Sequence, residues 1–266
     1  MSDGSPRAHV ERTRTPRGAQ VATLTLDHQP LNLFDQKMMD SLRAHISEIS
    51  ADCPRALVIR AQGRLTSAGV DVNLFAGLDS DQATGMWRGL IDEVIYPIER
   101  LSCPVIFAAK GLTLTAAFEI ALACDFILAT PEAQFGLIER TIGLTPSMGG
   151  PQRLAERAGS GRARELIMTG ATYDATTMAA WGVVNAVCSN LDEATTSLAH
   201  QLADGPTLAH AATKKLIMAW RAGGSAIADQ LTPDVSGSLF ATNDLKSGVA
   251  NFLTDGPRHG TNYTGT

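Results

Sequence analysis

Two glutamates are candidates for acid/base chemistry. Glu119 lies in a largely apolar segment, residues 110–125, which is predicted to run from the end of a strand into a helix. A carboxylate in such surroundings needs a partner or a function, and burial would raise its pKa. Glu139 lies twenty positions later, in the Gly- and Pro-rich stretch of residues 133–151. Together the two carboxyl groups could take a proton from one atom and deliver a proton to another.

Each glutamate also has a purely structural interpretation. Glu119 could interact with the dipole at the N-terminus of its helix or take part in a cap. Glu139 could form an ion pair with the adjacent Arg140. Considered one at a time, the two residues leave both interpretations open.

Two loops could offer backbone N–H groups to an oxygen that becomes negative during a reaction. The first loop, residues 63–71, directly follows a predicted strand and consists largely of small residues, so a ligand could lie against its backbone. A plain tight turn is an equal alternative for this loop. The second loop ends near Ala116, in the first turn of the predicted helix. Amides at that place have no intrahelical partner, and the helix dipole favours negative charge there.

The elements that must position these residues follow from the apolar pattern. Short apolar runs typical of buried strands alternate with amphipathic stretches typical of helices, and residues after 191 are helical in pattern. The predicted strands are residues 21–26, 56–61, 105–109, 126–129 and 183–187. The predicted helices are residues 35–49, 86–101, 115–124, 192–203, 206–221 and 238–253, with breaks at Gly223-Gly224 and Thr232-Pro233. The sequence therefore predicts an α/β fold with a helical C-terminal part.

Composition narrows the class of protein. The 266-residue chain is 44% hydrophobic and 18% charged, which favours a packed globule. Its net charge of −5 gives no general basic field for nucleic acid or anionic lipid. The four cysteines form no CxxC pair, so we expect reduced thiols and no metal site. Residues 1–19 are polar and without periodicity, which predicts a disordered leader. No secretory signal or membrane span is apparent, and a cytoplasmic protein is expected.

Five motifs, in order along residues 21–253, resemble the crotonase superfamily of enoyl-CoA hydratases and isomerases. They are Leu31-Asn32-Leu33, Ser67-Ala68-Gly69-Val70-Asp71, Glu119-Ile120-Ala121-Leu122-Ala123-Cys124-Asp125, Ala133-Gln134-Phe135-Gly136 and Gly149-Gly150-Pro151-Gln152-Arg153-Leu154. The resemblance implies a spiral of ββα units over residues 20–195. It also implies a helical part over residues 196–266 that serves as a lid or in forming a homotrimer or a dimer of trimers.

The resemblance also implies roles for particular residues. The N–H groups of Val70 and Ala116 would form an oxyanion hole around a thioester carbonyl, while Glu119 and Glu139 would be the acid/base pair. Further residues are expected to contact the substrate or its coenzyme A portion. These are Leu31, Ala68, Gly69, Asp71, Val72, Thr115, Phe240 and Lys246.

The implied reaction is the reversible hydration of a trans-2-enoyl-CoA to a 3-hydroxyacyl-CoA in fatty acid metabolism, with coenzyme A as part of the substrate and no separate cofactor. One departure bears on this expectation. Thr115-Ala116-Ala117 stands where the family usually has three glycines, and Phe118 adds further bulk. A backbone with φ > 0 at an alanine there would be strained. Double-bond isomerisation and acyl-CoA binding without turnover therefore remain alternatives.

Overall fold

The computed structural model describes residues 7–256 and 260–266. Its main sheet has six strands in the order β1-β2-β3-β4-β6-β9, in which β1 is antiparallel to β2 and every other pair is parallel. The strands are β1 (Ala8–Arg14), β2 (Gln20–Leu26), β3 (Ala56–Ala61), β4 (Val105–Ala109), β6 (Phe126–Ala129) and β9 (Ala186–Val187). The first four predicted strands are confirmed, and the fifth, predicted over residues 183–187, is shorter than expected.

Strand β1 corrects the prediction of a disordered leader. Its register with β2 runs from Ala8 opposite Leu26 to Arg14 opposite Gln20. The strand lies at the edge of the sheet, where only one face packs against the core, so polar side chains are tolerated on the other face. Ala8 is buried, whereas His9 is exposed. Residues 1–6 of the predicted leader lie outside the described residues.

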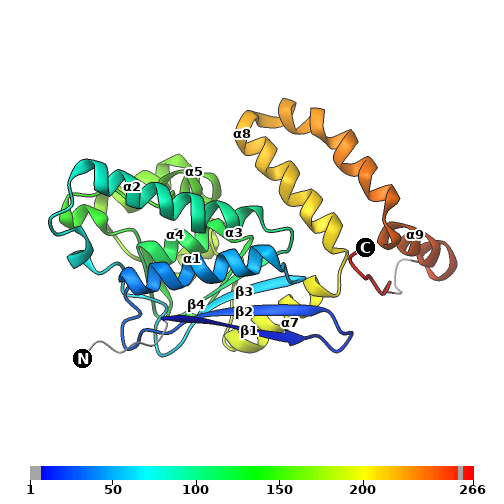
Figure 1. Cartoon of the computed structure of the whole chain (residues 1–266), viewed down its shortest axis with the longest axis horizontal. Coiled ribbons are helices and arrows are strands. Elements are labelled where there is room, and N and C mark those ends of the chain that lie inside the picture. Colours follow the sequence, from blue (N-terminus) through cyan, green and yellow to red (C-terminus); the bar gives the residue numbers. More distant parts are fainter. Residues whose placement is uncertain (1–6, 257–259) are drawn as a thin grey trace.

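Helices cover both faces of the sheet, as Figure 1 shows for α1 (Gln36–Ala51) above it and α7 (Leu191–Ala203) below it. Strand β4 is buried along its whole length, because it lies between two parallel neighbours and between these two layers. Helix α7 packs Ala199 and Ala203 into the same apolar cluster as Ile106 of β4. The α/β body therefore includes all of α7, and the boundary predicted at residue 196 falls inside this helix.

A second, smaller sheet was not predicted. It contains β5 (Leu112–Leu114), β7 (Gln134–Gly136) and β8 (Tyr173–Asp174), in that order. Strands of two or three residues are too short to show an alternating pattern. Strands β4 and β5 precede helix α4 (Ala116–Ala123), and β6 and β7 precede helix α5 (Gly150–Thr169). These are the ββα units that the resemblance implied.

Shorter elements complete the body. Residues predicted as one helix, 86–101, form the end of α2 (Ser80–Leu90), a π-helical turn η2 (Ile91–Ile95) and α3 (Tyr96–Arg100). The remaining elements are the 3₁₀ turns η1 (Val72–Phe75) and η3 (Glu139–Ile142) and the helix α6 (Ala175–Ala180).

The chain after α7 forms an arm that extends away from the body and folds back (Figure 1). The arm contains α8 (Thr207–Ser238), η4 (Leu239–Ala241) and α9 (Asn243–Asp255). The predicted break at Gly223-Gly224 is confirmed, because both residues have non-helical dihedral angles. The predicted break at Pro233 is wrong: the helix continues through this exposed position, where water can satisfy the carbonyl left without an amide partner. Within residues 7–256 and 260–266, every helix is too short or too polar to cross a membrane.

Candidate active site

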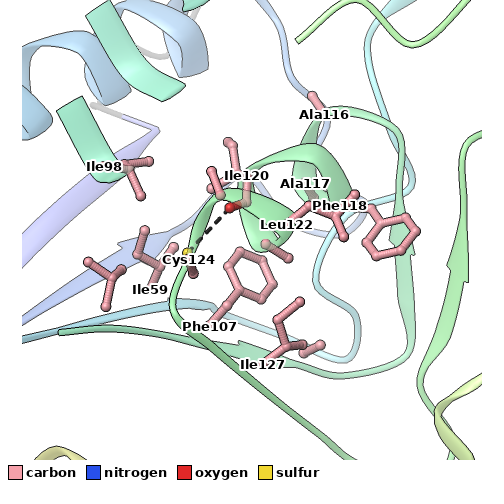
Figure 2. Packing of buried hydrophobic residues seen from close by; sticks show 14 of the residues in the cluster. Ile59, Ile98, Phe107, Ala116, Ala117, Phe118, Ile120, Leu122, Cys124 and Ile127 are labelled. Atoms are coloured by element: carbon pink, nitrogen blue, oxygen red, sulfur yellow. Dashed lines mark hydrogen bonds between the residues drawn. The ribbon is translucent and has the colours of Figure 1, made fainter. Parts of the chain in front are cut away.

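Helix α4 holds Glu119 inside the body. All eight of its residues are buried, as expected for a helix that is apolar on every side. Its neighbours come from three strands of the main sheet, β3, β4 and β6, and from α3. Figure 2 shows Ile59, Ile98, Phe107 and Ile127 around the helix. This tight packing fixes the backbone from which the Glu119 side chain projects.

The Glu119 carboxyl group is fixed by two backbone amides. Its Oε1 atom accepts hydrogen bonds from the N–H groups of Met148 and Gly150, both at 2.8 Å. Burial and, to a smaller extent, the nearby Glu139 raise the pKa of Glu119 to about 8, although the two amides and Arg153 act in the opposite direction. At neutral pH the carboxyl group therefore tends to hold its proton.

Glu139 is the first residue of η3 and is also buried. Its Oε2 atom has no hydrogen-bond partner among the described residues, and burial raises the pKa of Glu139 to about 7. The alternative ion pair with Arg140 is not formed among the described residues, because the Arg140 guanidinium donates instead to the Thr169 carbonyl at 2.8 Å. A buried carboxyl with an unpaired oxygen is suited to bind a polar ligand.

The Val70 and Ala116 amides belong to two loops that pair side by side. The Ser67 N–H donates to the Leu112 carbonyl at 2.8 Å, and the Leu114 N–H donates to the Ser67 carbonyl at 3.1 Å. Beyond this pairing, neither the Val70 nor the Ala116 N–H donates to another residue that the structure describes. Both amides are therefore available to an incoming acceptor.

The direction of each amide follows from the planarity of the trans peptide bond, in which N–H and C=O point in opposite directions. The Thr115 carbonyl accepts from Glu119 N–H at 2.9 Å, so the Ala116 N–H points out of the N-terminal end of α4. The Gly69 carbonyl accepts from Phe34 N–H at 3.0 Å, so the Val70 N–H points away from Phe34. The positive φ of Gly69, +116°, produces this orientation.

Backbone strain lies at Thr115 rather than at the alanines. Thr115 has φ 49° and ψ −121°, whereas Ala116 and Ala117 are already helical. Positive φ is a genuine outlier for a β-branched residue. The Thr115 hydroxyl is buried and has no hydrogen-bond partner among the described residues. The condition for strain at the alanines, a positive φ, is therefore not met, since the tight turn falls one residue earlier.

A cavity of about 180 Å³ brings most of the expected site residues together. Both glutamates and both amide loops line it. The expected residues in its wall are Ala68, Gly69, Val70, Val72, Thr115, Glu119 and Glu139. Ala116 is the residue directly after Thr115.

Apolar side chains that the sequence did not single out as site residues form the rest of the cavity wall. They include Phe75, Trp87, Ile138, Ile142 and Leu144. The rings of Phe75 and Trp87 are in contact, with centroids 5.6 Å apart. The sequence did not identify Trp87 as a cavity residue, because nothing in the pattern of a helix tells a side chain in the core from one beside a cavity.

Four of the expected substrate contacts do not line this cavity. Leu31 is largely exposed, although its carbonyl accepts from the Ala68 N–H at 2.9 Å. The Asp71 side chain caps η1 by accepting from Asn73 N–H at 3.0 Å. Phe240 and Lys246 lie in the C-terminal arm, which Figure 1 shows at the opposite end of the molecule from α2.

Known protein structures share the arrangement of ββα units described above. The chain is similar to the crystal structure of an enoyl-CoA hydratase from Bacillus anthracis. The TM-score is 0.87 and the identity 26%, over 98% of this chain and 100% of that one. The fold is that of the crotonase superfamily.

The family follows from the sequence comparison. Residues 16–259 match the family described as enoyl-CoA hydratase/isomerase. The chain is 31% identical to a protein from Rhizobium meliloti (strain 1021) named probable enoyl-CoA hydratase, over 88% of this chain and 91% of that protein. It is 30% identical to a trans-2-decenoyl-(acyl-carrier-protein) isomerase from Streptococcus mutans, over 86% of this chain and 90% of that protein. The chain belongs to the enoyl-CoA hydratase/isomerase family.

Proposed function

We propose that the protein is an enoyl-CoA hydratase, which adds water reversibly to a trans-2-enoyl-CoA to give the 3-hydroxyacyl-CoA. The observation that carries the proposal is the position of two buried carboxyl groups, Glu119 and Glu139, in the wall of one cavity beside two unpaired backbone amides. Both carboxyl groups have a raised pKa near neutrality, which is the range that acid/base catalysis requires.

The proposed mechanism assigns one task to each group. The Val70 and Ala116 amides donate to the thioester oxygen, which draws electrons from the C2–C3 double bond. Water held between the carboxyl groups gives a proton to the ionised carboxylate as its oxygen bonds to C3, so an enolate forms. The protonated carboxyl group then delivers a proton to C2, and the carbonyl is restored. Every atom comes from substrate and water, so this reaction needs no metal or redox cofactor.

Both carboxyl groups have a raised pKa, so one of the two can be protonated while the other is ionised. The protonated member would carry the proton that goes to C2, and the ionised member would take the proton from water. Two neighbouring carboxyl groups titrate as a pair, so the functional state is the pair holding a single proton. In this mechanism Ala68, Gly69 and Val72 lie beside the thioester.

The test is a hydration assay with crotonyl-CoA and longer trans-2-enoyl-CoAs, followed by the loss of conjugated absorbance. Glu119→Gln and Glu139→Gln should each lower kcat by about 10²–10⁴-fold, because each removes one proton-transfer group. Glu132→Gln is the matched control, since Glu132 is an exposed glutamate outside the cavity. Rates equal to wild type in both cavity variants would overturn the proposal.

Isomerisation of the double bond is the second candidate reaction, because a relative of 30% identity is named as an isomerase. Product analysis with a 3-enoyl-CoA separates the two, since an isomerase moves the double bond without adding water. Titration calorimetry with the same thioesters identifies the third alternative, in which the protein binds acyl-CoA tightly but turns over none.

We also propose that the protein acts in the cytoplasm as a homotrimer or a dimer of trimers. The C-terminal arm exposes a series of large apolar side chains that a second copy could cover. They include Ile217, Trp220, Ile227, Phe240, Val249, Phe252 and Leu253. In such an assembly Phe240 and Lys246 could reach the coenzyme A of a neighbouring subunit.

A further inference from the structure

An ionic network lies between the body and the C-terminal arm, with Glu99 and Arg153 buried and Arg221 and Glu156 at the surface. Arg153 of α5 binds Glu99 of α3 with two parallel contacts, Nε to Oε1 at 2.9 Å and Nη2 to Oε2 at 2.6 Å. Arg221 of α8 donates to the same Glu99 Oε1 at 2.6 Å and to Glu156 at 2.9 Å. Burial opposes the ionisation of Glu99, but the two arginines outweigh it and lower the pKa of this carboxyl group. The network therefore balances two arginines against two glutamates.

Arg153 also holds the turn that binds Glu119. Its remaining terminal nitrogen, Nη1, donates to the Gly149 carbonyl at 3.2 Å. The amides on either side of Gly149, those of Met148 and Gly150, both donate to Glu119 Oε1. One side of this turn is thus fixed by Arg153 and the other side binds the candidate catalytic carboxyl group.

Gly149 allows this close approach. Its φ is +90°, and a Cβ atom there would collide with the Arg153 guanidinium. No other residue type leaves room for the arginine at this distance from the turn. The contacts form an unbroken series of hydrogen bonds from Arg221 through Glu99 and Arg153 to the turn whose amides bind the Glu119 carboxyl group.

We propose that Arg153 is a positioning residue that orients the Glu119 carboxyl group through the Met148–Gly150 turn, and that Arg221 couples this arrangement to the seating of the C-terminal arm. The inference rests on the proposed function, in which Glu119 transfers a proton. The groups that act electrostatically on Glu119 are Glu139 of η3 and Arg153 of α5. The arm is also attached by Lys214, which contacts Asp125 at 2.8 Å, so loss of Arg221 would not detach it.

The experiment compares Arg153→Lys and Arg221→Met with wild type in crotonyl-CoA hydration across pH. Lysine keeps the charge but cannot make the paired contacts to Glu99 together with the contact to Gly149. We expect Arg153→Lys to lower kcat by about 10- to 100-fold and to leave KM within about 3-fold of wild type. The reason is that the Glu119 carboxyl group, which this substitution would misplace, acts in the chemical step. Arg221→Met should lower kcat by about 3- to 10-fold. In both variants the alkaline limb of the kcat profile should move to higher pH.

Arg162→Lys is the matched control in the same helix, because Arg162 forms an exposed pair with Glu165 at 2.8 Å. A kcat and pH profile equal to wild type in folded Arg153→Lys would overturn the proposal for positioning, and the same result in Arg221→Met would overturn the coupling to the arm. Should Arg153→Lys fail to fold, the Arg221→Met profile still decides whether the network acts on Glu119.

The carboxyl ¹³C signal of Glu119, assigned with Glu119→Gln, separates this inference from the proposed function. If wild type hydrates no enoyl-CoA, the function fails, but the pKa of Glu119 can still be measured in each variant. A pKa that moves upward in Arg153→Lys supports the positioning role, and an unchanged pKa contradicts it.

Discussion

Gly69 and Thr115 face each other so closely that a Cβ atom on Gly69 would lie 2.8 Å from the Thr115 hydroxyl oxygen. Each residue directly precedes one of the two unpaired amides, those of Val70 and Ala116, and each has a positive φ. The strain at a threonine in this conformation costs about 1–3 kcal/mol. The close contact thus adds to the backbone hydrogen bonds that join the two loops of the candidate oxyanion hole.

We predict that Gly69→Ala removes most hydratase activity and destabilises the protein by more than about 1 kcal/mol, because the new methyl group meets Thr115 at an unfavourable φ. Adding Thr115→Gly to this variant should remove the collision, while the alanine that replaces Gly69 keeps its backbone strain. A double-mutant cycle measured by urea denaturation and by kcat/KM tests this contact. Additive effects of the two substitutions would show that the two side chains do not interact.

We predict that Glu119→Gln makes the protein more stable above pH 8 while it impairs catalysis. The folded-state pKa of about 8 lies above the ordinary value of 4.5, so the unfolded chain loses its proton first as pH rises. The stabilising contribution of the protonated form is therefore complete below about pH 4.5 and is lost as pH rises through about 8. Glutamine keeps an oxygen for the Met148 and Gly150 amides and does not ionise.

Thermal unfolding at several pH values measures this effect. We expect a gain of up to about 5 kcal/mol at pH 9 and none near pH 4, since the pKa is raised from 4.5 to about 8 and each unit of pKa shift corresponds to about 1.4 kcal/mol. Glu132→Gln is the exposed control and should show no gain. An equal gain at both pH values would mean that ionisation is not the cause.

Asn32 is predicted to be essential to the shape of the first loop. It is buried with φ 48°, and its side chain donates to the carbonyls of Gln62 and Leu65 at 2.8 and 3.1 Å and accepts from His28 N–H at 2.8 Å. Its own carbonyl accepts from the Ser67 hydroxyl at 2.8 Å. Asn32→Ala should cost about 2–4 kcal/mol, because buried backbone groups lose their partners at a positive φ.

Asn32→Gly separates the two causes, since glycine tolerates the positive φ but lacks the side-chain hydrogen bonds. We expect it to be more stable than Asn32→Ala by about 1 kcal/mol yet still less stable than wild type in urea denaturation. Equal stability of the two variants would show that the positive φ at residue 32 contributes nothing to the loss of stability in Asn32→Ala.

The exposed apolar residues of the arm are predicted to form the contact between copies. Phe252→Asp and Leu253→Asp should shift the protein toward the monomer, because each places a charge in an apolar interface. Light scattering after size-exclusion chromatography measures the mass, with Glu132→Gln as the unaffected control. A wild-type protein that is monomeric at micromolar concentration would contradict this prediction.

The amino-acid sequence by itself determined the elements whose physical signal is local. Continuous apolar runs defined strands such as β3 and β4, and the motif around Glu119 defined the α4 segment and, by resemblance, the fold. The resemblance identified Glu119 and Glu139 as the candidate pair, and the apolar surroundings of Glu119 in the sequence supported it, because a carboxylate in such surroundings needs a partner or a function. Strand β1 was missed because an edge strand packs on one face and its other side chains are polar.

Only the tertiary structure decided how these groups act together. Burial raises the pKa of both Glu119 and Glu139, and the proximity of Glu139 adds to the effect at Glu119; both causes depend on the segments packed around these residues. The strained φ of Thr115 and the contacts of Arg153 likewise arise where separate loops and helices meet. Distances between residues far apart in sequence are fixed by packing, and no periodicity along the chain encodes them.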